Sequence, residues 1–188
     1  MTACCGILLA AGRATRFGGD KLLHPLPDGT PIALASARAM LAALPRLIAV
    51  VAADNRPLAR LFEEEGIATV IAPDAAAGMG ASLAAGIAAA PADGAWLVAL
   101  ADMPFIQPDS IAAVAAALAA GAPLAAPVHC GRRGHPVGFA AEFRATLMNL
   151  HGDAGARGIL DAQRDRLRLV DVADPGILRD IDRPEDLK

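Results

Sequence analysis

A basic, glycine-rich segment follows the first apolar run of the chain, between Leu9 and Lys21. Its glycines allow the backbone to turn tightly and approach a ligand closely, and exposed N–H groups in such a loop form a concavity that binds anions. Arg16 and Lys21 add fixed positive charge that suits a triphosphate. The spacing matches neither a Walker A loop nor a GxGxxG fingerprint. The residues alone therefore leave two interpretations, a phosphate site or an ordinary glycine-rich connection.

A carboxylate follows another apolar run, at Asp102 in the segment 101–104. A carboxylate at the end of a buried strand is costly unless it is hydrated, paired or bound to a metal. Mg2+ takes one or two carboxylates together with phosphate oxygens and waters, so Asp102 alone would be sufficient as its protein ligand. The alternative is a turn aspartate that bonds its own backbone.

Asp182, close to the end of the sequence, offers a second carboxylate for the same metal. A different pattern competes there, because Asp182 and Glu185 have the spacing of a capping box and Pro184 suits the first turn of a helix. Both roles, metal ligand and helix cap, remain open for Asp182.

The segment 78–83 places two glycines and the hydroxyl of Ser82 before an apolar helical pattern. The backbone at Gly80 and the Ser82 hydroxyl suit contacts with a nucleobase or a ribose. The alternative is a plain loop in which Ser82 is the N-cap of the following helix.

Two later polar segments, 133–139 and 152–157, also carry hydrogen-bond donors. His135 and Arg157 are suited to bind a phosphate. Simpler alternatives exist here too: His135 satisfies a loop carbonyl, and Asp153 caps the next helix.

Most of these segments follow predicted strands in a regular alternation of strands and alanine-rich helices. The expected strands are 3–10, 47–53, 68–72, 95–100 and 124–128, and the expected helices are 31–44, 57–65, 82–90 and 108–120. Such alternation predicts βαβ units and a mainly parallel sheet. Ligands bind such sheets beyond the carboxyl ends of the strands, which is where the unusual residues lie.

The remainder of the chain predicts a short strand at 136–140, helices at 142–149 and 154–164, and a strand at 167–172. The 188 residues show no internal repeat or long linker, so we expect a single domain over 1–188.

Composition narrows the classes of partner and location. The net charge is -3 with no Lys/Arg tract, which argues against nucleic acid and against anionic membranes. The three cysteines, at 4, 5 and 130, fit small apolar residues in a reducing compartment. No basic residue precedes the first apolar run, and Gly121 and Pro123 interrupt the uncharged stretch 111–128. We therefore expect a cytoplasmic protein.

Several motifs together resemble one family. The sequence Leu-Ala-Ala-Gly at 9–12, followed by Arg-Phe-Gly at 16–18 and Lys21, resembles the signature of Rossmann-like nucleotidyltransferases. Ala-Asp-Met-Pro at 101–104 is similar to their metal motif. Gly-His-Pro-Val at 134–137 and Gly-Asp-x-Gly-Ala-Arg at 152–157 resemble the molybdenum cofactor cytidylyltransferase family. The resemblance implies a three-layer Rossmann-like α/β fold with a mainly parallel sheet.

The resemblance also implies roles for particular residues. Arg16 and Lys21 would grip the triphosphate, with Lys21 beside the α-phosphate, and Asp102 would bind Mg2+, with Asp182 as the candidate second ligand. The implied nucleotide contacts are Leu9, Ala10, Ala11, Gly12, Arg13, Arg16, Lys21, Gly80 and Ser82, and the implied acceptor contacts are His135, Asp153 and Arg157.

The implied reaction transfers CMP from CTP to the terminal phosphate of a phosphorylated pterin, the molybdenum cofactor, for delivery to a molybdoenzyme. Ala11 favours CTP, because relatives that use GTP carry glycine there. Ala14 departs from the serine or glycine of many members, so a side-chain hydroxyl contact is lost at that position. A guanylyltransferase, another nucleotidyltransferase and a non-enzymatic cofactor carrier remain the alternatives.

Overall fold

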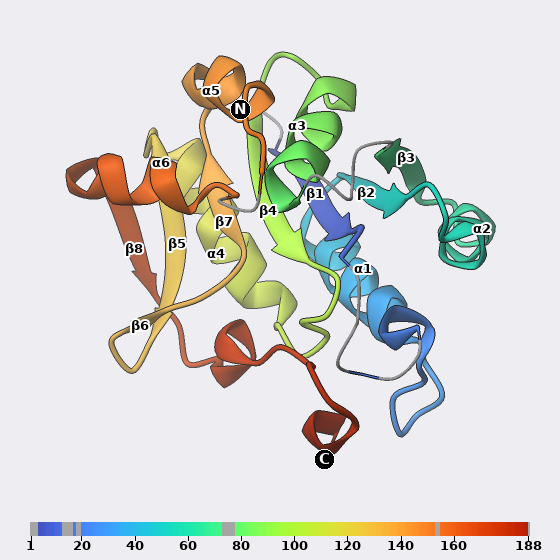
Figure 1. Ribbon diagram of the computed structural model, residues 1–188. Helices are drawn as coiled ribbons and strands as arrows, with labels where there is room; N and C mark the ends of the chain where they lie inside the picture. The colour runs from blue at the N-terminus through green and yellow to red at the C-terminus, as the bar shows by residue number, and fades with distance from the viewer. Residues whose placement is uncertain (1–3, 13–16, 18–19, 73–77, 153–154, 188) are drawn as a thin grey trace.

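The computed structural model describes residues 4–12, 17, 20–72, 78–152 and 155–187. In that part of the chain eight strands form one sheet, in the order β3-β2-β1-β4-β7-β5, with β8 and the short β6 also paired to β5 (Figure 1). The strands are β1 (Cys4–Ala10), β2 (Arg46–Ala52), β3 (Ala68–Ala72), β4 (Ala95–Leu100), β5 (Leu124–His129), β6 (Arg132–Arg133), β7 (Val137–Phe139) and β8 (Leu167–Asp171).

The sheet has a topological switch point between β1 and β4. The chain passes from β1 to β2 and β3 on one side, then returns to place β4 on the other side of β1, with all of these pairings parallel. The carboxyl ends of β1 and β4 therefore lie side by side and their following loops diverge. Open α/β sheets bind ligands at such a point.

The second half of the sheet is mixed. β7 runs antiparallel to both β4 and β5, whereas β8 is parallel to β5. The predicted three-layer α/β fold with a mostly parallel sheet is confirmed, with β7 as an antiparallel insertion. The segment 130–134 forms a tight hairpin that contains β6.

Helices cover both faces and create two cores (Figure 1). Alternate residues of β1 divide between them: Leu8 joins the core beneath α1 (Ile32–Ala43), α2 (Arg56–Glu64) and α4 (Pro108–Ala119). Ile7 joins the core beneath α3 (Met79–Ala89), α5 (Arg144–Met148) and α6 (Arg157–Ala162). This period of two is what a strand buried on both faces requires.

Three helix predictions need correction. α3 begins at Met79 and not at Ser82, because Gly78 supplies the N-cap with a positive φ of 112°. Ser82 is therefore inside the helix, and its interpretation as an N-cap is wrong. The helix expected at 142–149 is divided into η3 (Ala141–Phe143) and α5, and the one expected at 154–164 is described only as α6.

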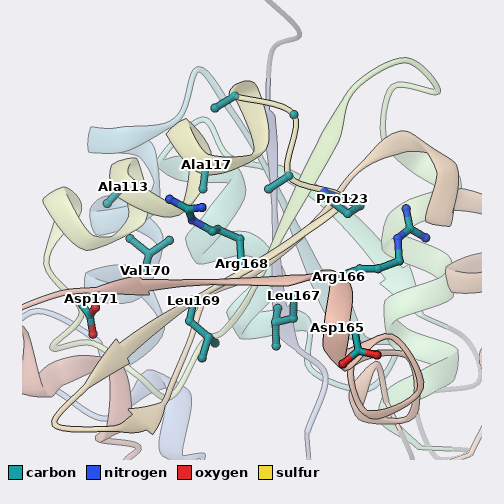
Figure 2. Close-up of a pocket in the computed structure, with 13 residues that line it drawn as sticks. Ala113, Ala117, Pro123, Asp165, Arg166, Leu167, Arg168, Leu169, Val170 and Asp171 are labelled. Carbon is teal, nitrogen blue, oxygen red and sulfur yellow. The ribbon is translucent and has the colours of Figure 1, made fainter.

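A groove of about 850 Å3 lies between α4 and the edge strand β8 (Figure 2). Arg168 and Val170 occupy the side of β8 that faces Ala117 of α4. Of the described residues predicted to bind nucleotide, metal or acceptor, none lines this groove. Among the described helices, none is both long and apolar enough to span a membrane.

Candidate active site

A buried lysine links two carboxylates at the switch point. Lys21 begins η1 (Lys21–Leu23), and its Nζ lies 2.8 Å from Asp102 Oδ2 and 3.4 Å from Asp182 Oδ1. Lys21 is 7% exposed, whereas the Asp102 and Asp182 side chains are 24% and 48% exposed. Three residues from distant parts of the chain, all predicted for the site, thus meet at one ammonium group.

Backbone hydrogen bonds fix Asp102 in place. The N–H of Ala101 donates to the carbonyl of Leu9 at 3.0 Å, which joins the ends of β1 and β4. The Asp102 carbonyl accepts from the N–H of Ile181 at 2.9 Å, which brings the C-terminal segment alongside. From α1, the buried Ser36 hydroxyl donates to the Ala101 carbonyl at 2.9 Å.

The second carboxylate oxygen of Asp102, Oδ1, is buried and has no hydrogen-bond partner among the described residues. A buried carboxylate oxygen without a donor is unfavourable by itself, but it is the hard oxygen ligand that Mg2+ prefers. Within the described ranges no group of three or more His, Cys, Asp or Glu side chains forms a metal cluster. The two carboxylates fit an ion whose remaining ligands are phosphate oxygens and waters.

The capping interaction near Asp182 comes from an unexpected residue. Asp186 Oδ2 accepts from the N–H groups of Asp182 and Arg183, at 3.0 and 2.8 Å. The hydrogen bonds from Arg183 and Asp182 lower the pKa of Asp186. The reciprocal contact predicted for Glu185 is thus made by Asp186, while Asp182 Oδ1 faces Lys21.

The first loop is only partly described. Leu9, Ala10 and Ala11 are buried at the end of β1, whereas Gly12 is exposed, and a Cβ added to Gly12 would have no described atom within 4 Å. Arg13 and Arg16 lie outside the described residues, so their predicted triphosphate contacts stay predictions.

The start of α3 is occupied by another segment of the protein. The N–H of Gly80 donates to the Gly152 carbonyl at 2.8 Å, and a Cβ on Gly80 would lie 2.9 Å from three backbone atoms of His151 and Gly152. Ser82 is only 4% exposed. The close approach at Gly80 is therefore made to the chain itself, and it joins the predicted nucleotide segment to the predicted acceptor segment.

Of the predicted acceptor residues the structure describes His135 and Arg157, and no hydrogen bond or ion pair joins these two. His135 lies two residues before β7, and its buried Nδ1 has no partner among the described residues. Burial lowers the pKa of His135, an effect that the negative charges of Asp102 and Asp180 oppose. Arg157 is exposed and lies 3.7 Å from Asp161 of its own helix. Asp153 lies outside the described residues.

Two supporting residues escaped the sequence analysis. Asn55 caps α2 by accepting from Leu58 N–H and also donates to Asp20 at 2.8 Å, directly before Lys21. Asp174 is buried beside the start of α4. The dipeptides Asp54-Asn55 and Asp174-Pro175 are turn and cap signals, but nothing in them reveals the distant partner.

The switch point carries Lys21 after β1 and Asp102 after β4, and the C-terminal segment adds Asp182. Together with the similarity to known proteins, this arrangement defines a nucleotidyltransferase. The chain belongs to the MobA-like NTP transferase domain family, whose model matches residues 6–167.

Relatives align with nearly the whole chain. Nicotine blue oxidoreductase of Paenarthrobacter nicotinovorans is 31% identical, over 97% of this chain and 93% of its own length. Purine catabolism protein PucB of Bacillus subtilis is 29% identical, over 96% of this chain and 92% of its own.

Solved structures agree with the fold. Rv0371c of Mycobacterium tuberculosis is 26% identical with a TM-score of 0.82, covering 98% of this chain and 95% of its own. A complex of Rv0371c with manganese superposes with a TM-score of 0.80 at 24% identity, over 98% of this chain and 96% of its own. Molybdopterin-guanine dinucleotide biosynthesis protein A of Archaeoglobus fulgidus shares the fold at 19% identity and a TM-score of 0.69, over 97% and 94% of the two chains.

Proposed function

We propose that this nucleotidyltransferase transfers CMP from CTP to the terminal phosphate of a phosphorylated pterin, the molybdenum cofactor, and releases pyrophosphate. The observation that carries the proposal is the Lys21 ammonium held by Asp102 and Asp182 at the switch point. Nucleotide phosphates bind α/β sheets at this place, and a preorganised charge there stabilises a phosphoryl transition state.

The reaction balances without a protein base. An oxygen of the pterin phosphate attacks the α-phosphorus of CTP, a new phosphorus–oxygen bond forms, and the bond to the bridging oxygen of pyrophosphate breaks. A phosphate monoester has its second pKa at about 6 and is largely ionised at pH 7. The attacking oxygen therefore needs no proton acceptor, which agrees with the absence of a histidine–carboxylate pair among the hydrogen bonds of the described site.

Lys21 is proposed to neutralise charge on the α-phosphate. Its stem is buried and its ammonium is held by two carboxylates, so the position of the charge is set before substrate arrives. The lysine ammonium is a compact charge with three donors, so it can interact with more than one of the oxygens over which the charge of the phosphoryl group is spread. Arg16, from the same loop, would bind the β- and γ-phosphates.

Asp102 and Asp182 would hold Mg2+. When bound, the ion would neutralise charge on the triphosphate and orient it. The unpartnered Oδ1 of Asp102 and the half-exposed Asp182 carboxylate are the oxygens that fit this role. Manganese is a suitable test ion, since the structural relative Rv0371c has been solved in complex with it.

The base and acceptor assignments rest on the sequence motifs. Ala11, which is buried directly after β1, is proposed to favour CTP over GTP. The hydrogen bond between Gly80 and Gly152 supports an acceptor segment that adjoins the nucleotide segment. His135, Asp153 and Arg157 are proposed to bind the pterin, and a molybdoenzyme to receive the product.

The direct test is pyrophosphate release from the purified protein with Mg2+, the pterin cofactor and one of CTP, GTP or ATP. We expect release with CTP, and a pterin product whose mass has increased by one CMP. Release with GTP instead would retain the mechanism and overturn the role of Ala11. Tight pterin binding without release from any nucleotide would support the carrier function and reject the transferase proposal.

A further inference from the structure

A buried aspartate anchors the segment that carries Asp182 into the site. Asp174 is 6% exposed and lies eight residues before Asp182. Its Oδ2 accepts from the Gln107 N–H and the Ser110 hydroxyl, both at 2.8 Å, and its Oδ1 accepts from the Gly176 N–H at 2.8 Å. A buried carboxylate with three donors is fully engaged, and it lies at the N-terminus of α4, where negative charge is favourable.

We call residues 172–182 the C-terminal strap (Figure 1, red). It begins where the Val172 N–H donates to the Val128 carbonyl, at the end of β5. After Asp174 it forms η5 (Pro175–Leu178), which is packed so tightly that a Cβ on Gly176 would clash with the Phe105 carbonyl. The strap is thus seated against the loop that follows β4.

The far end of the strap contacts three parts of the candidate site. The Ile177 carbonyl accepts from the His135 N–H at 3.0 Å, and the Ile181 N–H donates to the Asp102 carbonyl at 2.9 Å. One residue later, Asp182 Oδ1 lies 3.4 Å from Lys21 Nζ. The position of the Asp182 carboxylate therefore depends on a strap whose single buried charged side chain is Asp174 among the described residues of 172–182.

We propose that Asp174 is a positioning residue for the divalent metal site. By tying the strap to Gln107 and Ser110, it holds Asp182 within reach of the ion that Asp102 binds. The inference rests on the proposed function, because it assigns Asp174 to the metal site of that reaction. Residues that orient metal ligands typically change metal affinity by about 10–100-fold when they are mutated.

The test is a double-mutant cycle on Mn2+ affinity, measured by the electron paramagnetic resonance of free Mn2+ without nucleotide, because CTP itself would chelate the ion. Asp174→Asn keeps the size of the side chain, but its NH2 group would face N–H or O–H donors that now bond the carboxylate. This variant should weaken Mn2+ binding by about tenfold. Asp182→Asn should weaken it at least as much. The double variant should be no weaker than Asp182→Asn, because Asp174 acts only through Asp182.

Two further variants separate positioning from general destabilisation. Ser110→Ala removes one of the three hydrogen bonds and should weaken Mn2+ binding by about threefold, which keeps the test valid if Asp174→Asn folds poorly. Phe62→Leu disturbs the core beneath α2, which lies on the β2–β3 side of the sheet whereas the strap begins beside β5 at the other side, and should leave Mn2+ affinity unchanged. Hydrogen exchange of residues 174–182 should accelerate in Asp174→Asn and not in Phe62→Leu.

Unchanged Mn2+ affinity in Asp174→Asn and Ser110→Ala would overturn the inference. Losses that multiply in the double variant would also overturn it, since Asp174 would then act independently of Asp182. If the wild-type protein itself binds no Mn2+, the metal site of the proposed function fails, and the role of Asp174 fails with it.

Discussion

At the scale of single residues, Lys21 connects the fold with the proposed function. Removing an ammonium from water is costly unless opposite charges replace the lost hydration. Asp102 and Asp182 provide those charges, and the arrangement in turn keeps two carboxylates close without mutual repulsion. A divalent cation would be held by the same two carboxylates, so Lys21 and the metal ion are linked through shared partners.

Lys21→Met tests this linkage at the residue scale. The apolar replacement leaves the negative charges of Asp102 and Asp182 without their counter-charge. We expect the free energy of unfolding to fall by roughly 1–2 kcal/mol, less than for a fully buried pair because the Asp182 side chain is half exposed. Added Mg2+ should raise the melting temperature of the variant more than that of the wild type, because the ion replaces the ammonium. Thermal melting with and without Mg2+ measures both effects. A variant as stable as the wild type and indifferent to Mg2+ would contradict the linkage.

Cys4 gives a pH-dependent prediction away from the site. Burial, helped by the neighbouring Cys5, raises the pKa of the Cys4 thiol from 9.0 to about 12. A raised pKa means that the folded state disfavours the thiolate, so this contribution to stability is complete below pH 9.0 and is lost as the pH rises toward 12. By pH 10 the loss should be roughly 1 kcal/mol.

The measurement compares melting temperatures at about pH 8 and about pH 10 in the wild type and in Cys4→Ala. The chain has no tyrosine, but burial also raises the pKa of the Cys5 thiol, so Cys4→Ala should reduce the alkaline loss of stability without abolishing it. The decrease in melting temperature between the two pH values should be smaller in Cys4→Ala than in the wild type. Equal losses in both proteins would show that Cys4 is not the responsible group.

At the scale of helices and strands, the contact between α3 and the segment 151–152 determines how a substitution at Gly80 affects stability. Helix propensity alone predicts that glycine-to-alanine changes stabilise a helix by about 1 kcal/mol. At Gly80 the added Cβ would meet backbone atoms of His151 and Gly152 at 2.9 Å, so Gly80→Ala should instead destabilise the protein by about 1–3 kcal/mol.

Gly158 provides a matched control, because it lies in α6 and an added Cβ would have no described atom within 4 Å. Gly158→Ala should be neutral or stabilising. Urea unfolding of both variants gives the comparison, and a stabilised Gly80→Ala protein would show that the two segments do not pack as described.

Apolar runs in the sequence predicted the strands well. β3 and β4 have the expected bounds, and most other strands differ by a single residue. The start of α3 was placed three residues late, because Ser82 looked like a cap while the actual cap is a glycine with positive φ. Local residue preferences could not distinguish the two, since Gly80 is held by the distant Gly152 carbonyl.

At the scale of the whole molecule, the alternation of strands and helices predicted the sheet and located the site at its carboxyl edge. The meeting of Lys21, Asp102 and Asp182 was predicted only through a family resemblance, as their separation in sequence carries no spacing signal. The antiparallel insertion of β7 and the path of the strap escaped prediction, because contacts such as Ile181 to Asp102 join segments far apart in the chain.

The central claim is that the Lys21–Asp102–Asp182 arrangement performs nucleotidyl transfer. Its most direct test is the rate of pyrophosphate release by the wild type and by Asp102→Asn, with saturating Mg2+, CTP and pterin cofactor. The amide preserves the shape of Asp102 but removes its charge, so we expect turnover to fall at least about a hundredfold while the melting temperature stays within a few degrees. An Asp102→Asn protein that is folded and retains wild-type, metal-dependent turnover would contradict the claim.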